Sequence, residues 1–289
     1  MALSHDSLWP RAYSLFSQEK SGPSDVTLVG VPASRTSLSP TQAHETPDAI
    51  RKALLRYSTA HSDSHVKIEN IKVNDAGNVL SPDIDETQSI SAIHSLSSES
   101  EFLIALGGDN SITYAGFQGT GATGLITLDA HYDLRDGVSN GSPVRRLIEA
   151  GLNGKKVVQI GIADFSNSAE YAERARKFGI TVIPRSELRS KSIAEVWARA
   201  LEIAGDKVFV DFDMDVCDRS VVPACPAAAP GGISADELRQ FAFLAGNSHS
   251  VIAVDISEVD STQDSKDERT VRLAALVVLE LIAGFSARE

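Results

Sequence analysis

The sequence predicts an α/β fold in which a parallel sheet is covered by helices on both faces. Short runs rich in β-branched residues alternate with longer helical patterns along almost the whole chain, and this alternation is typical of βαβ units. The 289 residues, 42% of them apolar, are enough to build a large buried core. Periodicity alone does not distinguish an open sheet from an eight-stranded barrel, but in both folds ligands bind beyond the carboxyl ends of the strands.

Eight apolar runs predict the strands. They cover residues 26–31, 66–73, 101–106, 124–128, 156–160, 180–183, 207–212 and 251–256. Helical patterns lie between them at residues 47–57, 86–96, 168–178, 192–204, 234–245 and 268–285. We interpret the Ser-rich stretch 95–100 as a turn and the Pro-rich stretch 223–232 as a rigid loop. No linker or repeat interrupts this order, so we expect one domain over residues 1–289, with residues 1–25 as an N-terminal extension.

The composition points to a small-molecule partner. A formal net charge of −12 argues against nucleic acid and against anionic membrane surfaces, because both require clustered Lys and Arg. No apolar run approaches the roughly 18 residues that span a bilayer, and the N-terminus does not resemble a signal peptide, so we expect a cytoplasmic protein. The two cysteines, Cys217 and Cys225, are too few for a disulfide framework, and whether they pair is left open.

The first chemical motif follows the apolar run at residues 124–128, where the chain reads DAHYDLR. In an extended segment Asp129, His131 and Asp133 point to one side, so that two carboxylates and an imidazole converge on one spot. A shared cation would relieve their mutual repulsion. The alternative interpretation is a capping Asp and a structurally satisfied His near a turn.

A second acidic cluster follows the run at residues 207–212 and contains Asp211, Asp213, Asp215 and Asp218. Carboxylates packed at one edge raise each other's pKa values strongly unless a divalent cation neutralises them. Oxygen-rich sites suit Mg²⁺ or Mn²⁺, and a histidine among the ligands favours Mn²⁺. A solvated acidic loop is the alternative.

Two further motifs also stand at the ends of predicted strands. The stretch IALGGDNSIT ends in two glycines, after which Asp109, Asn110 and Ser111 are expected to open a helix. The stretch VDISEVDST supplies acidic side chains, among them Glu258, that could face a cationic substrate group or cap the next helix.

Together these motifs resemble the ureohydrolase family of arginases, agmatinases and formimidoylglutamases. That family carries GGDHS, DAHxD, SxDxDxxDP and a later glutamate motif in this order. The counterparts here begin at Gly107, Asp129, Asp211 and Ser257. The stretches GVPAS and TPDAIR also resemble the first strand and first helix of the family. The resemblance implies an arginase-like fold of three αβα layers with an eight-stranded parallel sheet.

The resemblance also implies a binuclear Mn²⁺ centre. One ion would use Asp129, Asp133 and Asp213 as shared ligands, with Asn110 on its open side. The other ion would add His131 and Asp215. A hydroxide held between the ions would attack an amidine carbon, and Asp133 would pass a proton to the leaving nitrogen. Most of the family has histidine at the position of Asn110, so the ion near Asn110 is expected to bind more weakly.

The loop after DAHYDLR favours the formimidoylglutamases within this family. It reads VSNGSPVRR, which resembles their stretch SGTPFR and lacks the histidine that arginases and agmatinases carry there. The implied substrate is N-formimidoyl-L-glutamate, which would be cleaved to L-glutamate and formamide in histidine degradation. Its carboxylates need cations, and Arg145 is the first candidate, with Arg135 and Arg146 next. Lining residues are expected from the same loop, namely Asn140, Gly141 and Ser142.

Two other functions remain open from the sequence. A guanidino hydrolase that releases urea is one, because Glu258 aligns with the glutamate that such enzymes use near the guanidinium. A metal-poor, non-catalytic relative is the other, and Asn110 motivates it. Family members are often oligomers, so a homo-oligomer is also expected.

Overall fold

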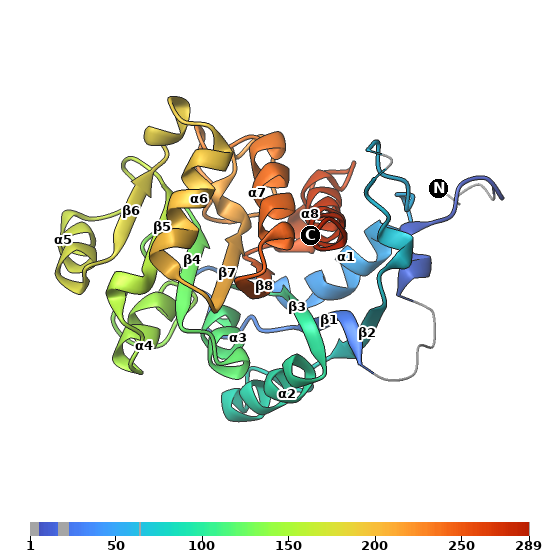
Figure 1. Ribbon diagram of the computed structural model, residues 1–289. Helices are drawn as coiled ribbons and strands as arrows, with labels where there is room; N and C mark the ends of the chain where they lie inside the picture. Colours follow the sequence, from blue (N-terminus) through green and yellow to red (C-terminus); the bar gives the residue numbers. More distant parts are fainter. Residues whose placement is uncertain (1–5, 17–22, 64, 289) are drawn as a thin grey trace.

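The structure, a computed structural model, describes residues 6–16, 23–63 and 65–288 and contains an eight-stranded parallel sheet (Figure 1). The strands are β1 (Ser24–Val31), β2 (Val73–Asn78), β3 (Ser100–Gly107), β4 (Gly124–Leu128), β5 (Val157–Ile162), β6 (Thr181–Pro184), β7 (Val208–Asp213) and β8 (Val251–Ser257). Their order in the sheet is β2-β1-β3-β8-β7-β4-β5-β6. The sheet is therefore open, with β2 and β6 at its edges, and is not a closed barrel.

Helices cover both faces of this sheet. They are α1 (Thr46–Leu54), α2 (Glu86–Ser98), α3 (Ile112–Thr120), α4 (Pro143–Glu149), α5 (Ala169–Phe178), α6 (Ile193–Ala204), α7 (Ala235–Asn247) and α8 (Arg269–Ser286). Short 3₁₀ helices η1 to η7 lie at Ala12–Leu15, Ala43–Glu45, Ile68–Asn70, Gly154–Lys156, Glu187–Arg189, Met214–Val216 and Ser261–Gln263. Apolar residues of α1, α6, α7 and α8 share one buried cluster, and those of α2, α3, α4 and α5 share the other. The predicted three-layer αβα architecture is confirmed.

The sheet order brings the four sequence motifs together. Strands β3, β8, β7 and β4 are consecutive in the sheet, and each is followed by one motif. Because parallel strands end at the same edge, the motif residues meet although they lie up to about 150 positions apart in the chain. The central strands are apolar and almost fully buried, which fixes this edge rigidly against the helices.

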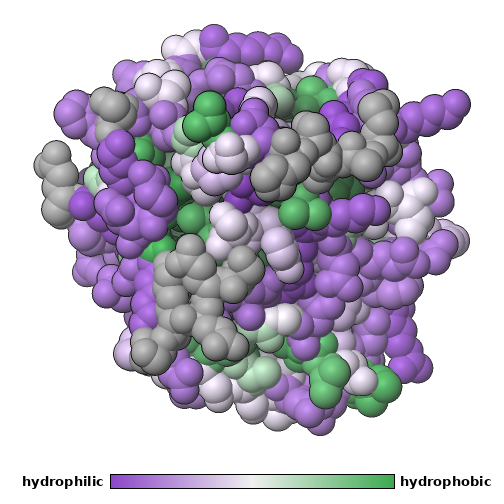
Figure 2. Space-filling view, turned by 90° about the vertical axis from the view of Figure 1, so that its right-hand side faces the viewer, coloured by the Kyte–Doolittle hydropathy of each residue, from purple (hydrophilic) through white to green (hydrophobic). Residues whose placement is uncertain are grey.

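Most predicted elements are present, with one wrong strand. The prediction for residues 124–128 coincides with β4. Residues 66–73 were predicted as a strand, but Val66 and Ile68 are buried through a 3₁₀ turn and β2 begins only at Val73. The edge strand β2 reads VNDAGN, with alternating exposure, and its polar sequence lacks the apolar signal of a strand. Figure 2 shows this end of the molecule, where the surface is mainly hydrophilic and apolar residues form separate patches.

Smaller differences concern helix ends and short helices. The turn predicted at residues 95–100 is largely helical, because α2 continues to Ser98 and β3 begins at Ser100. The list of predicted helices lacks α4, a seven-residue helix with Pro143 in its first turn. Both cysteines are free, buried thiols. Within the described residues, no helix is long and apolar enough to cross a membrane.

The predicted N-terminal extension, residues 1–25, is described only in part, because residues 1–5 and 17–22 lie outside the described residues. Its 3₁₀ helix η1 buries Leu15, and Leu15 and Phe16 belong to the same apolar cluster as α1 and α8. Strand β1 begins at Ser24, two residues before the predicted start of the domain.

Truncation of a central aromatic side chain should measure how much this core contributes to the free energy of unfolding. Phe102 on β3 is fully buried and its ring lies 5.9 Å from that of Phe285 on α8. We expect Phe102→Ala to lower the free energy of unfolding by about 3–5 kcal/mol, because it removes apolar contacts and leaves a cavity. Leu80→Ala, at a side chain that is 77% exposed, is the control and should change it by less than about 0.5 kcal/mol in urea titrations. Equal effects of the two substitutions would contradict this description of the core.

Candidate metal centre

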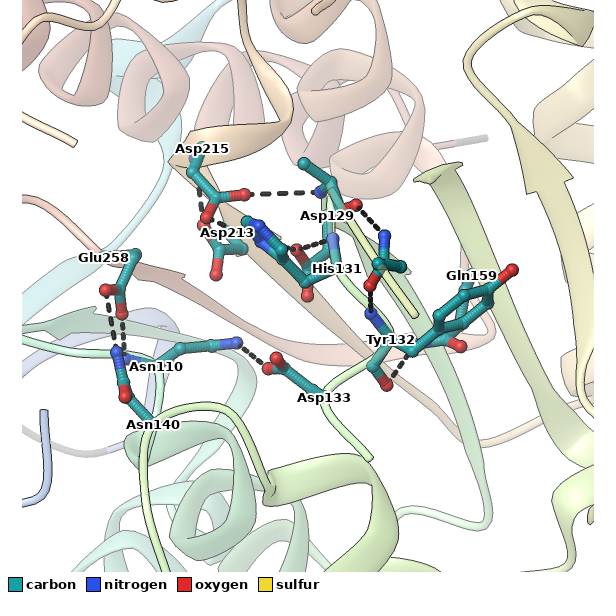
Figure 3. A network of polar contacts seen from close by, with 12 residues as sticks. Asn110, Asp129, His131, Tyr132, Asp133, Asn140, Gln159, Asp213, Asp215 and Glu258 are labelled. Atoms are coloured by element: carbon teal, nitrogen blue, oxygen red, sulfur yellow. Dashed lines mark hydrogen bonds and ion pairs between the residues drawn. The ribbon is translucent and has the colours of Figure 1, made fainter. Parts of the chain in front are cut away.

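The acidic motif residues converge at the carboxyl edge of the four central strands (Figure 3). Asp129 comes directly after β4, Asp213 is the last residue of β7, and Asp215 lies in the following 3₁₀ helix η6. The backbone N–H groups of His131 and Asp215 donate to Asp129 and Asp213 over 2.6 and 2.9 Å. These turns redirect the chain past each strand so that alternate side chains face one cavity.

Two groups of side chains in this region have the geometry of a metal site. Asp129, His131 and Asp215 form one group, and Asp129, Asp133 and Asp213 form the other. Within each group, one potential ligand atom from each residue lies within 4.8 Å of the others. Asp129 belongs to both groups, which is the position of a ligand shared by two ions. The predicted sharing of Asp133 and Asp213 stays a prediction.

The donors in these two groups fit a pair of divalent cations. The four carboxylates are at most 7% exposed, and His131 is the only side chain among the five that can carry positive charge. Its Nδ1 lies 3.0 Å from Asp215 Oδ2 and 3.4 Å from Asp129 Oδ1. Asp129 Oδ2 is buried and has no hydrogen-bond partner among the described residues. Oxygen-rich sites with one imidazole suit Mn²⁺.

Without cations, this cluster retains protons. Burial and the neighbouring charge of Asp215 raise the pKa of Asp129 to about 7. Burial also raises the pKa values of Asp133 and Asp213 well above their usual range, and other carboxylates add to the effect. Burial alone would lower the pKa of His131, but Asp215 and Asp129 raise it to about 12. The electrostatics of the cluster thus favour the binding of positive charge, either as protons or as cations.

Asn110 lies beside this cluster but turns its amide nitrogen toward it. Its Nδ2 donates to Asp133 Oδ2 over 2.6 Å, while its Oδ1 accepts from the hydroxyls of Thr113 and Ser257 over 2.7 and 2.8 Å. A metal ligand would present the oxygen, which here is occupied by two hydroxyl donors. In this arrangement Asn110 orients Asp133, and an ion held by Asp129, Asp133 and Asp213 would lack the ligand that the family resemblance implied at Asn110.

Sequence reasoning missed the pairing of Asp211 with Asp255 beneath the cluster. The two residues are register partners on β7 and β8, both are fully buried, and their carboxyl groups are hydrogen-bonded to each other. A hydrogen bond between two carboxyl groups requires a proton on one of them. Burial raises the pKa of Asp255 to about 7, and burial together with the charge of Asp255 raises that of Asp211.

Glu258 faces the same cavity from the end of β8. Its Oε2 accepts the backbone N–H of Asn110 over 2.9 Å and its Oε1 accepts Asn140 Nδ2 over 2.8 Å. Burial, followed by the charges of Asp215 and Asp109, raises its pKa to about 8. Glu258 has a left-handed backbone with φ of +61°, as do Asp133 and Phe165 at +51° and +64°, and all three line the cavity. Backbone strain of this kind is typical of functional sites.

The cavity has a volume of 490 Å³ and is lined by several of the predicted substrate-binding residues. Arg135, Asn140 and Gly141 line it, together with the metal-site residues His131, Asp133, Asp213 and Asp215. Gly141 leaves room for Arg135, because a Cβ there would lie 2.7 Å from Arg135 Cδ. Arg135 is exposed at the cavity mouth, whereas the acidic groups are buried at its floor.

Arg145 and Ser142 lie behind the loop instead of lining the cavity. Arg145 Nε donates to the carbonyl of Arg135 over 2.5 Å, and its terminal nitrogens donate to Gly137 O and Glu149. Ser142 exchanges hydrogen bonds with Ser139 to close a turn. The guanidinium of Arg145 is thus already used by the protein's own acceptors and is not directed at the substrate space. Arg146 is likewise engaged, by Glu86.

The remaining walls of the cavity come from segments without a recognisable motif. The loop between β5 and α5 contributes Phe165, Ser166, Asn167 and Ser168, and the segment after β1 contributes Leu38 and Ser39. Gln159, a polar residue in the otherwise apolar strand VVQIGI, is the nearest sequence signal to the β5–α5 loop, although it does not line the cavity itself.

A family model described as the arginase family matches residues 24–284. The chain belongs to the arginase family. Its sequence is 36% identical over 275 residues to a formimidoylglutamase from Halalkalibacterium halodurans, covering 89% of this chain and 86% of that protein. The crystal structure of formimidoylglutamase from Bacillus subtilis matches with a TM-score of 0.91 and 30% identity, over 99% and 95% of the two chains.

A Trypanosoma cruzi formiminoglutamase structure with Mn²⁺ matches this arginase-family chain with a TM-score of 0.90 and 26% identity, over 97% of this chain and 100% of that one. The family and the fold predicted from the four motifs are confirmed by these comparisons together with the sheet order.

The metal-free protein should become less stable as the pH rises from about 5 to about 8. Asp129 and Glu258 have pKa values of about 7 and about 8 in the folded state, above their values in the unfolded chain. Their stabilising contribution is complete below the unfolded pKa and is lost as the pH rises through the folded pKa. Thermal unfolding in EDTA should show this loss, and saturating Mn²⁺ should largely remove it. A melting temperature in EDTA that rises over this range would contradict the burial of these acids.

Proposed function

We propose that this protein is a manganese-dependent hydrolase, with two ions per chain, that cleaves N-formimidoyl-L-glutamate to L-glutamate and formamide. The observation that carries the proposal is the polarity of the cavity, which has an acidic floor and an exposed arginine at its mouth. The substrate has the opposite polarity, with a formamidine at one end and carboxylates at the other. The likeness of this chain to the formimidoylglutamases described above supports the same reaction.

The metal ligands in this proposal are the two groups of side chains that share Asp129. One ion would be held by Asp129, His131 and Asp215 and the other by Asp129, Asp133 and Asp213, and the ion near Asn110 would bind with the lower affinity. When bound, a pair of divalent cations supplies a nucleophile from water at near-neutral pH. The orientation of Asn110 supports the difference in affinity, because its Nδ2 donates to Asp133 and its oxygen is engaged elsewhere. A site that lacks one ligand binds its ion less tightly.

Glu258 and Asp133 are the proposed catalytic side chains. Glu258 is held by Asn110 N and Asn140 Nδ2 with one face toward the cavity, where its carboxylate can bind a cationic amidine. Asp133 also lines the cavity, where its carboxylate can accept a proton from water and pass it to the leaving nitrogen. In this scheme the departing amine becomes the amino group of glutamate.

Arg135 is the proposed anchor for a substrate carboxylate. It is exposed, it lines the cavity, and the glycine opposite gives it room to move. An arginine can bind a carboxylate through two parallel hydrogen bonds.

The sequence-based predictions of a cytoplasmic location and of a homo-oligomer stay predictions.

A product assay on a substrate panel tests the reaction. Mn²⁺-loaded protein should release formamide and glutamate from N-formimidoyl-L-glutamate, and should release little urea from arginine or agmatine. Release of urea without formamide would replace the proposal by a guanidino hydrolase. Absence of both products from protein that has bound Mn²⁺ would favour a non-catalytic relative.

Substitution of Arg135 tests the carboxylate anchor separately. We expect Arg135→Ala to raise KM for N-formimidoyl-L-glutamate by about 10- to 100-fold, which corresponds to the roughly 1.5–3 kcal/mol of a charged hydrogen bond. The turnover number should change little, because the metal ligands and Glu258 stay in position. Arg199→Ala is the matched control, since that arginine lies on α6 beside Glu187 and outside the cavity. An unchanged KM would mean that another group binds the carboxylate.

A further inference from the structure

The backbone on both sides of His131 is held by side-chain amides. Asn167 Oδ1 accepts the N–H of Tyr132 over 3.1 Å, and Asn167 Nδ2 donates to the carbonyl of Ala130 over 2.8 Å. Gln159 Nε2 donates to the carbonyl of Tyr132 over 3.0 Å. Three hydrogen bonds therefore fix the two peptide neighbours of one metal-site residue. Figure 3 shows Tyr132 between His131 and Gln159.

These hydrogen bonds replace a neighbouring strand. Strand β4 pairs with β5 as far as Leu128 and Ile160, and two further backbone hydrogen bonds, from Asp129 N to Ile160 O and from Ala163 N to Ala130 O, continue the pairing. Beyond Ala163 the chain turns away into the loop before α5. The carboxamide of Asn167 then supplies the acceptor that the neighbouring strand would have offered to the N–H of Tyr132, and adds a second donor to the carbonyl of Ala130.

Gln159 is unusual for its position. It is fully buried in an apolar strand, and its Oε1 has no hydrogen-bond partner among the described residues. An apolar side chain there would avoid leaving a buried oxygen unpaired. Among the described residues, the one hydrogen bond of the Gln159 side chain is its donation to Tyr132 O. Its presence is therefore explained by the need to hold that carbonyl.

We propose that Asn167 and Gln159 form an amide clamp that positions His131 as a metal ligand. They are positioning residues, because they act on the backbone beside His131 and do not contact the potential ligand atoms. The bend at Ala130 and His131 directs the imidazole toward Asp215, whose Oδ2 lies 3.0 Å from Nδ1. Groups that orient a ligand commonly set the affinity of a metal site. This inference rests on the metal centre proposed above.

The clamp also connects the metal site to the substrate cavity. Asn167 is partly exposed and lines the cavity, and the neighbouring Phe165 stands fully exposed at its mouth with a left-handed backbone. The β5–α5 loop therefore contacts the substrate space on one side and the His131 segment on the other.

Mn²⁺ titration calorimetry on the full chain tests the clamp without substrate. Asn167→Ala and Gln159→Leu should each weaken the site that contains His131 by about 10- to 100-fold. Asn153→Ala is the matched control, because that asparagine caps the 3₁₀ helix η4 away from the cavity and should leave the affinity unchanged. If Asn167→Ala does not fold, Asn167→Asp takes its place, since it keeps the shape but loses the donor to Ala130 O.

A double-mutant cycle distinguishes positioning of His131 from general loosening of the protein. If Asn167 acts through His131, Asn167→Ala should cause no further loss of Mn²⁺ affinity in a His131→Ala background. Additive losses would overturn the inference, as would unchanged affinity in the single variants. Failure of the wild-type protein to bind Mn²⁺ would instead overturn the metal centre itself. Unfolding temperatures in EDTA, with and without added Mn²⁺, should show a smaller metal-induced gain for the clamp variants.

Discussion

Electrostatic repulsion among buried carboxylates is the constraint on which the site depends. Asp129, Asp133, Asp213 and Asp215 meet at one sheet edge with a single imidazole between them. Burial makes their charges expensive, and the raised pKa values of three of them express this. Divalent cations would relieve this repulsion, which supports the proposed metal centre.

The layer of residues beneath the site is also polar and buried. Gln159, Thr127, Asp211 and Asp255 are register partners across β5, β4, β7 and β8. Gln159 Oε1 and Thr127 Oγ1 are buried and have no hydrogen-bond partner among the described residues. Each such atom costs about 1–3 kcal/mol, which apolar residues would avoid. This row of polar residues is explained by its contacts with the site above it. Gln159 donates to the carbonyl of Tyr132, and Asp255 and Asp211 accept from the hydroxyls of Thr113 and Ser257.

The sequence predicted the residues of the acidic cluster better than the walls of the cavity. Asp129, His131 and Asp213 were found because they stand at or just beyond the ends of apolar strands, and strand ends are visible in a sequence. The polar edge strand β2 was missed because burial on one face only leaves little apolar signal. The sequence ranked Arg145 ahead of Arg135, but Arg145 is held by acceptors of its own loop and Arg135 lines the cavity, because the direction of a side chain depends on the loop's own hydrogen bonds. Asn167 was missed because a lone asparagine in a loop carries no pattern.

The most direct test of the central claim is anomalous diffraction from crystals grown with excess Mn²⁺. Two peaks are expected, one among Asp129, His131 and Asp215 and the other among Asp129, Asp133 and Asp213. The carboxylates should keep the positions described here, with Asp129 between the peaks. Density without an anomalous peak at this edge, with the acids turned away from one another or paired with arginines, would contradict the account.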